Sequence, residues 1–172
     1  MNLTLPRRLL ALGVLVAAVA GIGSSAAEAK TPSRHIQLQP GSQITIVDDE
    51  SWPSSDEIET FRLDYVSGNI LNYKQPFATN AGYECAGDEV RVDFRQSSQL
   101  YDNGWALVTV DAFLKEGTSC WSNDLDGSAS LQFWIGPEQV LDKTLKVYNV
   151  DEGGDSATLK LKFKNEYFLS SM

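Results

Sequence analysis

The residues in this sequence that could do chemistry are mostly acidic, and they fall into three groups. The groups contain Asp88, then Asn123, Asp124 and Asp126, and finally Asp151, Glu152 and Asp155. Carboxylate and amide oxygens are ligands that Ca²⁺ takes in proteins, and neighbouring glycines allow the tight turns that such sites need. Dense like charges repel one another unless a cation joins them. The sequence therefore predicts a calcium site, with ordinary solvated turns as the alternative.

A calcium motif formed by one loop alone is excluded for the second group. An EF-hand loop begins with Asp and carries Glu at its twelfth position. Here Ser122 occupies the first position and Phe133 the twelfth. Any calcium site must therefore combine ligands from several loops, and it depends on how the fold arranges them.

The histidine content limits the enzyme classes that are open to this chain. His35 is the single histidine. Ser–His–Asp and Cys–His catalysis need a positioned imidazole, and zinc and copper enzymes need two or three His or Cys ligands. His35 also lies near the expected start of the mature chain, where order is poor unless the segment joins a sheet. A glycoside hydrolase needs only two carboxylates, so this class stays open.

The first 29 residues have the three parts of a secretory signal peptide. Arg7 and Arg8 supply the basic start, residues 9–23 are apolar, and residues 27–29 (Ala-Glu-Ala) fit the rule of two small residues at a cleavage site. The apolar stretch of about 15 residues is shorter than the ~20 of a transmembrane helix, which disfavours a membrane anchor. We expect cleavage before Lys30 and a mature protein that is secreted or periplasmic.

Two cysteines remain after the leader, Cys85 and Cys120, and they allow only one pairing. In an oxidising compartment a disulfide is the default state of such a pair. A spacing of about 35 residues with no nearby histidine argues against a metal-binding thiol pair. The sequence therefore predicts a Cys85–Cys120 disulfide.

Charge and composition narrow the range of partners. The formal net charge is −9 at pH 7, and the sequence pI is about 4.5. Such an acidic surface repels phosphate backbones and anionic lipids, which argues against nucleic-acid and membrane-surface binding. The chain is 42% hydrophobic and 22% charged, so long disorder is excluded. Removal of the leader leaves about 143 residues, which is the size of one domain.

The tryptophans suggest a different kind of ligand surface. Trp121 directly follows Cys120, and Trp134 faces away from its apolar neighbours Phe133 and Ile135. Exposed aromatic rings can stack on sugar rings, which makes Trp121 and Trp134 candidate ligand-binding residues. The favoured interpretation is structural: Trp134 packs under a second layer and Trp121 covers the disulfide.

Alternation of apolar and polar residues with a period of two dominates the mature chain. It is clearest over 157–164, where one face is apolar and the other carries a row of lysines. Similar runs occur at 44–46, 61–65, 90–96, 105–115, 131–135 and 145–148, and a weaker one at 69–76. About eight short strands predict an antiparallel β-sandwich, Ig-like or C2-like in general shape, with a barrel as the alternative.

The order of strands and turns predicts which loops meet. Asn103-Gly104 is a hairpin signal, and strands that run up and down place this hairpin opposite loops 116–128 and 150–156. Cys85 then lies at the same end as Cys120, as a disulfide requires, together with the acidic groups. We also expect residues 30–40 to form an extended arm or an edge strand, and the lysine row to protect a sheet edge.

These observations predict a signal peptide at 1–29, an N-terminal arm with a first strand and an acidic loop at 30–56, and a main sandwich domain at 57–172. The predicted function is that of a secreted, non-enzymatic binding or structural module that acts on an extracellular protein or carbohydrate. Calcium is the one cofactor that the acidic groups suggest. The alternative is a small secreted enzyme that uses carboxylates, such as a glycoside hydrolase.

Overall fold

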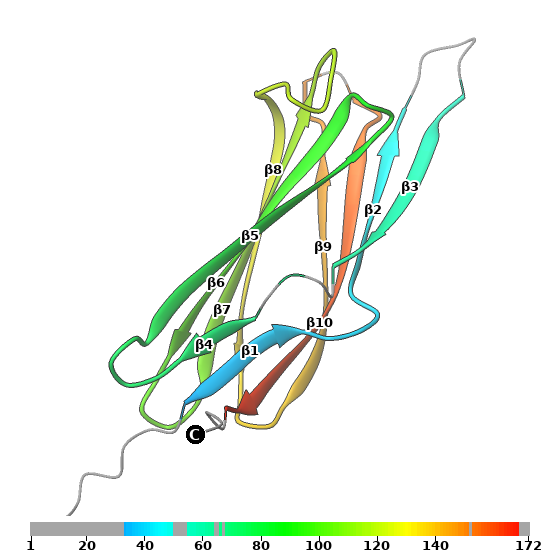
Figure 1. Ribbon diagram of the computed structural model, residues 1–172. Helices are drawn as coiled ribbons and strands as arrows, with labels where there is room; N and C mark the ends of the chain where they lie inside the picture. Colours follow the sequence, from blue (N-terminus) through cyan, green and yellow to red (C-terminus); the bar gives the residue numbers. More distant parts are fainter. Residues whose placement is uncertain (1–32, 50–54, 64–65, 67, 152, 169–172) are drawn as a thin grey trace, which may run out of the picture.

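The computed structural model describes residues 33–49, 55–63, 66, 68–151 and 153–168, and within these ranges the chain forms ten strands and no helix (Figure 1). The strands are β1 (Arg34–Leu38), β2 (Gln43–Asp48), β3 (Glu57–Arg62), β4 (Asn69–Leu71), β5 (Phe77–Ala86), β6 (Val90–Leu100), β7 (Ala106–Glu116), β8 (Asp124–Ile135), β9 (Val140–Tyr148) and β10 (Ser156–Tyr167). All strand pairs are antiparallel, and two sheets face each other. The predicted antiparallel β-sandwich is confirmed.

One sheet contains β5, β6, β7 and β8 in sequential order. The other has the order β3-β2-β10-β1-β4, with β9 on the remaining side of β10. Both β1 and β2 pair with the same side of β10, one after the other: Leu38 is opposite Phe163, and Gln43 is opposite Lys160. They act as one strand that is interrupted at Pro40-Gly41, so the second sheet is also about four strands wide.

The interruption between β1 and β2 has its own hydrogen bonds. The Gln39 amide donates to the Lys162 carbonyl, and the Lys162 amide donates to the Ser42 hydroxyl at 3.0 Å. Ser42 is buried, and a buried backbone amide needs a hydrogen-bond acceptor. The Ser42 hydroxyl supplies that acceptor to Lys162 where the pairing with β10 is interrupted. The N-terminal segment therefore continues along the whole length of β10.

Two expectations about sheet edges were wrong. Residues 34–38, within the predicted arm or edge strand at 30–40, form an inner strand that pairs with β10 on one side and β4 on the other. β10 lies in the middle of its sheet, so its lysine row does not protect an edge. The alternation of apolar and lysine residues in β10 shows only that one face of the strand meets water. It does not show which strands pair with β10, because β1 and β2 lie more than 100 positions earlier in the sequence.

The predicted loop at 116–128 is shorter than expected, because β8 begins at Asp124. Asp124 and Asp126 therefore belong to a strand, and a β-bulge shifts the β7–β8 register between Leu114 and Lys115. Gly127 lies so close to β9 that an added Cβ would be 2.0 Å from the Tyr148 carbonyl oxygen. The polar and glycine residues of this segment resemble a turn in the sequence. In the structure they form a β-bulge and allow the two sheets to approach closely at Gly127.

The core lies between the inner faces of the two sheets and follows the alternating pattern. Phe133 of β8 and Phe163 of β10 meet there with ring centroids 5.1 Å apart. A small polar network also crosses the interior: Gln96 donates to the Ile36 carbonyl, and Asn69 donates to the Ser98 hydroxyl at 3.1 Å. These bonds tie β6 to β1 and β4 and fix the relative position of the sheets. No described helix is long and apolar enough to cross a membrane.

Candidate ligand-binding face

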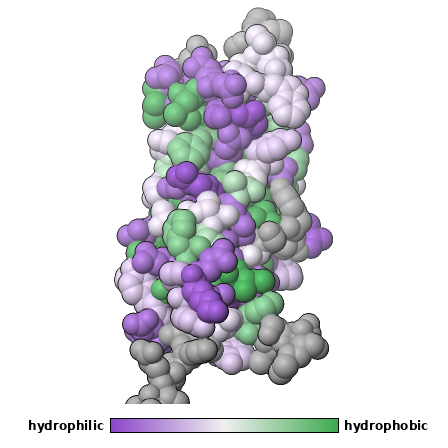
Figure 2. Space-filling model, turned by 60° about the vertical axis from the view of Figure 1, so that its left-hand side comes forward, coloured by the Kyte–Doolittle hydropathy of each residue, from purple (hydrophilic) through white to green (hydrophobic). Residues whose placement is uncertain are grey.

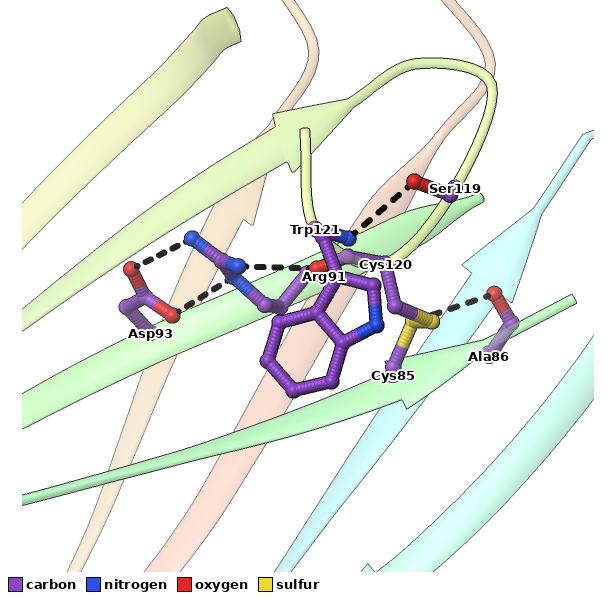
Figure 3. The surroundings of a disulfide bond; sticks show 7 residues. All are labelled: Cys85, Ala86, Arg91, Asp93, Ser119, Cys120 and Trp121. Atoms are coloured by element: carbon purple, nitrogen blue, oxygen red, sulfur yellow. Dashed lines mark hydrogen bonds and ion pairs between the residues drawn. A yellow bond between two sulfur atoms is a disulfide. The ribbon is translucent and has the colours of Figure 1, made fainter. Parts of the chain in front are cut away.

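The predicted disulfide is present and joins the end of β5 to the β7–β8 loop. Cys85 and Cys120 are bonded, with their Cα atoms 5.9 Å apart. Arg91 donates to the Cys120 carbonyl at 2.8 Å and forms an ion pair with Asp93, so the loop that carries Trp121 is also held to β6 (Figure 3). A disulfide is compatible with an extracellular or periplasmic protein.

The structure brings part of the predicted acidic groups together at this end, where they bind the backbone. The Asp126 carboxylate accepts the Glu116 amide at 2.7 Å, and the Asp155 carboxylate accepts the Asp49 amide at 2.8 Å. Asn149 links them, since its side chain donates to both Glu116 and Asp155. These carboxylates hold the ends of β7, β9 and β2 in place.

The other predicted calcium ligands are more scattered. Asp124 lines a cavity of about 110 Å³ with Glu116, Gly117 and Asp126. Asn123 accepts a hydrogen bond from Arg91, Asp88 lies in the β5–β6 turn, and Asp151 is held through its backbone amide. Glu152 lies outside the described residues. Among the described residues, no three His, Cys, Asp or Glu side chains are grouped to hold a metal ion, and calcium binding stays a prediction.

One acidic pair, Asp49 and Asp56, was not singled out as a site by the sequence, although it lies in the segment 30–56 where an acidic loop was predicted. A hydrogen bond with Asp56, the charge of Asp56, a smaller effect of desolvation and the charge of Asp155 together raise the pKa of Asp49 above its ordinary value. Both Asp49 and Asp56 are exposed, and neither lines one of the four cavities described for this structure. A general acid of a glycoside hydrolase also has a raised pKa, but it works inside a substrate cleft.

Most of the exposed aromatic residues lie on the outer face of the β5–β8 sheet and on its loops, while Tyr148 and Tyr167 lie on the other sheet. Those of the β5–β8 sheet and its loops include Phe77, Tyr83, Tyr101, Trp121 and Trp134. Trp134 is 48% exposed, so the expectation that a second layer covers it was wrong. Trp121, which follows Cys120, is 72% exposed. Both tryptophans are therefore available to a ligand.

Trp134 belongs to the aromatic group nearer the β6–β7 hairpin. Its ring lies against Tyr101 with centroids 4.8 Å apart and planes inclined by 55°. Beside Tyr101 is an open cavity of about 250 Å³. It is lined by Asn72, Tyr73, Pro76, Gln99, Leu100, Tyr101 and Asp102. Two aromatic rings and several hydrogen-bonding side chains thus surround a space that suits a small polar ring.

The second aromatic group lies at the disulfide end of the same face. Tyr83 and Trp121 meet edge to face, with ring centroids 6.2 Å apart. Tyr83 also borders a shallow cavity of about 440 Å³ together with Phe113 and Arg95. The sequence analysis identified Trp121 as a candidate but not Tyr83, because no local pattern shows that Trp121 contacts a residue on β5.

Between the two aromatic groups the face is polar, and its charges are paired. Thr79 and Ser97 share a hydrogen bond, and Gln132 donates to Thr109 at 3.0 Å. Figure 2, which turns the side of β6 and β7 forward, shows hydrophobic residues only in small areas among polar ones.

Asp111 shows how firmly these charges are paired. Burial of its carboxyl acts to raise the pKa of Asp111, but hydrogen bonds from Arg95 and Ser130 outweigh it and lower that pKa below the ordinary value. The Arg95–Asp111 ion pair is 2.9 Å long. Asp93 is likewise paired, with Arg91 and with Lys115 at 2.7 Å.

Comparisons with protein-family models, curated proteins and solved structures found no match for this chain.

Proposed function

We propose that the protein is an exported, non-enzymatic module that binds a carbohydrate on the outer face of its β5–β8 sheet. The observation that carries this proposal is the position of Tyr101, which contacts the exposed ring of Trp134 and also lines a small cavity with Gln99 and Asn72. An aromatic ring offers an apolar surface to the C–H face of a sugar, while amide side chains bind its hydroxyl groups. Both kinds of group occur here within one site.

Carbohydrate fits this face better than a protein partner does. A protein–protein interface has an apolar, well-packed centre and a polar rim. This face has the opposite arrangement, because its aromatic residues lie toward the two ends. The rows between them carry Ser97, Thr109 and the Arg95–Asp111 ion pair. Hydroxyl and amide groups in the middle of a face suit a ligand that is itself rich in hydroxyl groups.

A binding role fits better than hydrolysis. A glycoside hydrolase needs one carboxyl group that stays protonated near neutral pH and a second that stays ionised. On the strands of this face, Asp93 and Asp111 both pair with cations, and the pKa of Asp111 is lowered, which does not suit a general acid. Asp102 is the one carboxylate among the residues that line the cavity beside Tyr101, so that cavity lacks the second carboxylate that hydrolysis needs.

The test is binding of the purified mature protein to a panel of insoluble and soluble neutral polysaccharides. We expect Trp134→Ala to lower affinity by about tenfold or more, as for an aromatic residue at the centre of a binding site. Tyr148→Ala is the matched control, because Tyr148 is an exposed aromatic residue on the other sheet. Equal losses in both variants, or release of reducing sugars by the wild-type protein, would contradict the proposal.

Export is part of the same proposal, and it rests on the leader at 1–29 and on the disulfide. Residues 1–29 lie outside the described residues. N-terminal sequencing of the exported protein should begin at Lys30. A protein that still begins at Met1 would contradict this part.

A further inference from the structure

We infer that the outer face of the β5–β8 sheet binds an extended, uncharged oligosaccharide that lies along the strands and occupies both aromatic groups at once. This inference rests on the proposed carbohydrate-binding function and makes it more specific. It names a linear chain, bound along its length, in place of a single terminal sugar.

The positions of the two aromatic groups define a path for such a chain. Trp134 lies in the same row across the sheet as Leu107, Gln99 and Phe77. Tyr83 lies in the row of Asp93, so the two rows are six residues apart on both β5 and β6. At the rise of an antiparallel strand this is about 20 Å. A single sugar ring cannot reach both ends, whereas a chain of several rings can.

The side chains between the two aromatic groups are mostly polar. The middle row contains Ala81, Arg95, Asp111 and Ser130, and an ion pair holds Arg95 against Asp111. The row nearest the Trp134 group contains Thr79, Ser97, Thr109 and Gln132 in register across the four strands. These side chains are smaller than the aromatic rings at either end, so they leave room for a ligand that rests on the sheet. Their hydroxyl and amide groups offer hydrogen bonds along its length.

The charges of the face select against a charged chain. The cations Arg91, Arg95 and Lys115 form ion pairs with Asp93 or Asp111, so they are already neutralised by neighbours. The whole molecule carries a net charge of −9, which repels a polyanion approaching from solution. The charge distribution is therefore complementary to an uncharged polymer.

The experiment is a length series. The probes are β-linked glucose and N-acetylglucosamine oligomers from dimer to hexamer, with hexuronate oligomers as the anionic arm, and binding is measured by calorimetry. Joining two subsites in one ligand makes the second contact intramolecular, so affinity should rise steeply with length and level off once both aromatic groups are engaged.

Three variants locate the path. Trp121→Ala should lower hexamer affinity by about tenfold and leave dimer affinity unchanged, since loss of one subsite acts only on ligands that reach it. Trp134→Ala should weaken both ligands. Ser97→Arg places a long side chain between the subsites and should reduce hexamer affinity to that of the dimer. The near-ultraviolet circular dichroism of each variant checks that it is folded.

The outcomes separate the inference from the proposed function. If no neutral oligomer or polysaccharide binds, the proposed function itself fails. If the dimer binds as tightly as the hexamer and neither Trp121→Ala nor Ser97→Arg changes hexamer binding, the extended path is overturned while carbohydrate binding stands. Tighter binding of hexuronate oligomers than of the neutral oligomers would overturn the inference that the ligand is uncharged.

Discussion

At the scale of single residues, some polar side chains that suggest a ligand site in the sequence bind this protein's own backbone. Asp126 and Asp155 accept backbone amides, and Asn165 donates to the Gly104 and Ile135 carbonyls from a fully buried position. Such bonds satisfy backbone groups where strands end or bulge. A carboxylate in a loop is therefore weak support for a ligand site until its hydrogen bonds are known.

The disulfide gives the first prediction. Replacing both Cys85 and Cys120 by Ala should lower the free energy of unfolding by about 2–5 kcal/mol, because the closed loop restricts the unfolded chain. The bond spans a sequence separation of 35 residues. Urea denaturation measures the change, and the wild-type protein treated with reductant is the control. An unchanged midpoint in both samples would contradict the prediction.

The second prediction concerns Asp49, whose pKa is raised mainly by its hydrogen bond with Asp56 and by the charge of that residue. The folded state then holds a proton that the unfolded state has already released. Stability should therefore fall as the pH rises through the range just above the ordinary aspartate pKa. Asp49→Asn should flatten this part of the profile of thermal stability against pH.

Asp142→Asn is the control for Asp49→Asn, because it removes the same charge from an exposed position on β9. If both substitutions change the profile of thermal stability against pH equally, the pH dependence arises from net charge and not from the Asp49–Asp56 pair.

At the scale of elements, the turn between β5 and β6 shows how tightly one end of the sandwich is packed. Gly87 and Asp88 both have positive φ, at 60° and 61°, and the Glu89 amide donates to the Ala86 carbonyl. This is the backbone of a type I′ hairpin turn. A Cβ added at Gly87 would lie 1.9 Å from the buried Asp48 carboxylate, so glycine is needed for space as well as for its backbone angle.

Gly87→Ala should therefore destabilise the protein more than Gly41→Ala does. Gly41 also has a positive φ, at 95°, but nothing lies within 4 Å of an added Cβ. The left-handed backbone alone costs about 1–2 kcal/mol for a residue with a side chain, and we expect Gly41→Ala to show only this. Urea denaturation of both variants gives the comparison. Equal losses would mean that Asp48 moves aside without cost.

At the scale of the whole molecule, the net charge of −9 and the acidic end raise the question of a bound cation. If calcium binds the folded state with a dissociation constant near ~0.1 mM, millimolar calcium should add about 1–1.5 kcal/mol of stability. This corresponds to a rise of several degrees in Tm for a domain of this size. Magnesium should do less, because it requires a tighter octahedral site.

Thermal melts with chelator, calcium, magnesium and matched sodium chloride test this expectation. Asp124→Asn should reduce the calcium response, and Asp142→Asn should not, since Asp124 lines the cavity beside Asp126 and Asp142 lies on β9. An equal response to calcium and to sodium chloride would show only general screening of the acidic surface. The acidic residues would then have the structural roles seen in their hydrogen bonds.

The sequence by itself determined most of the strands, the antiparallel sandwich and the single cysteine pairing. Each of these depends on short-range information: the period-two alternation of β10 and β6, the glycines and asparagines of the turns, and the presence of only two cysteines after the leader. The sequence did not predict β5, because residues 77–86 show no clear alternation of apolar and polar residues. The up-and-down order of β6 to β8 then placed Cys85 and Cys120 at one end. Local pattern is sufficient here because neighbouring strands in the sequence are also neighbours in this sheet.

Only the tertiary structure decided which strands from distant parts of the chain pair and which outward residues stay uncovered. The pairing of β1 and β2 with β10 joins Arg34 to Tyr167, and no local pattern encodes a partner at that separation. Alternation shows that Trp134 points away from the core, but its exposure depends on whether another segment covers that face. Trp121 meets Tyr83 only because the disulfide and Arg91 hold its loop against β6. The candidate ligand face is thus a product of long-range contacts, which act between residues that the sequence keeps apart.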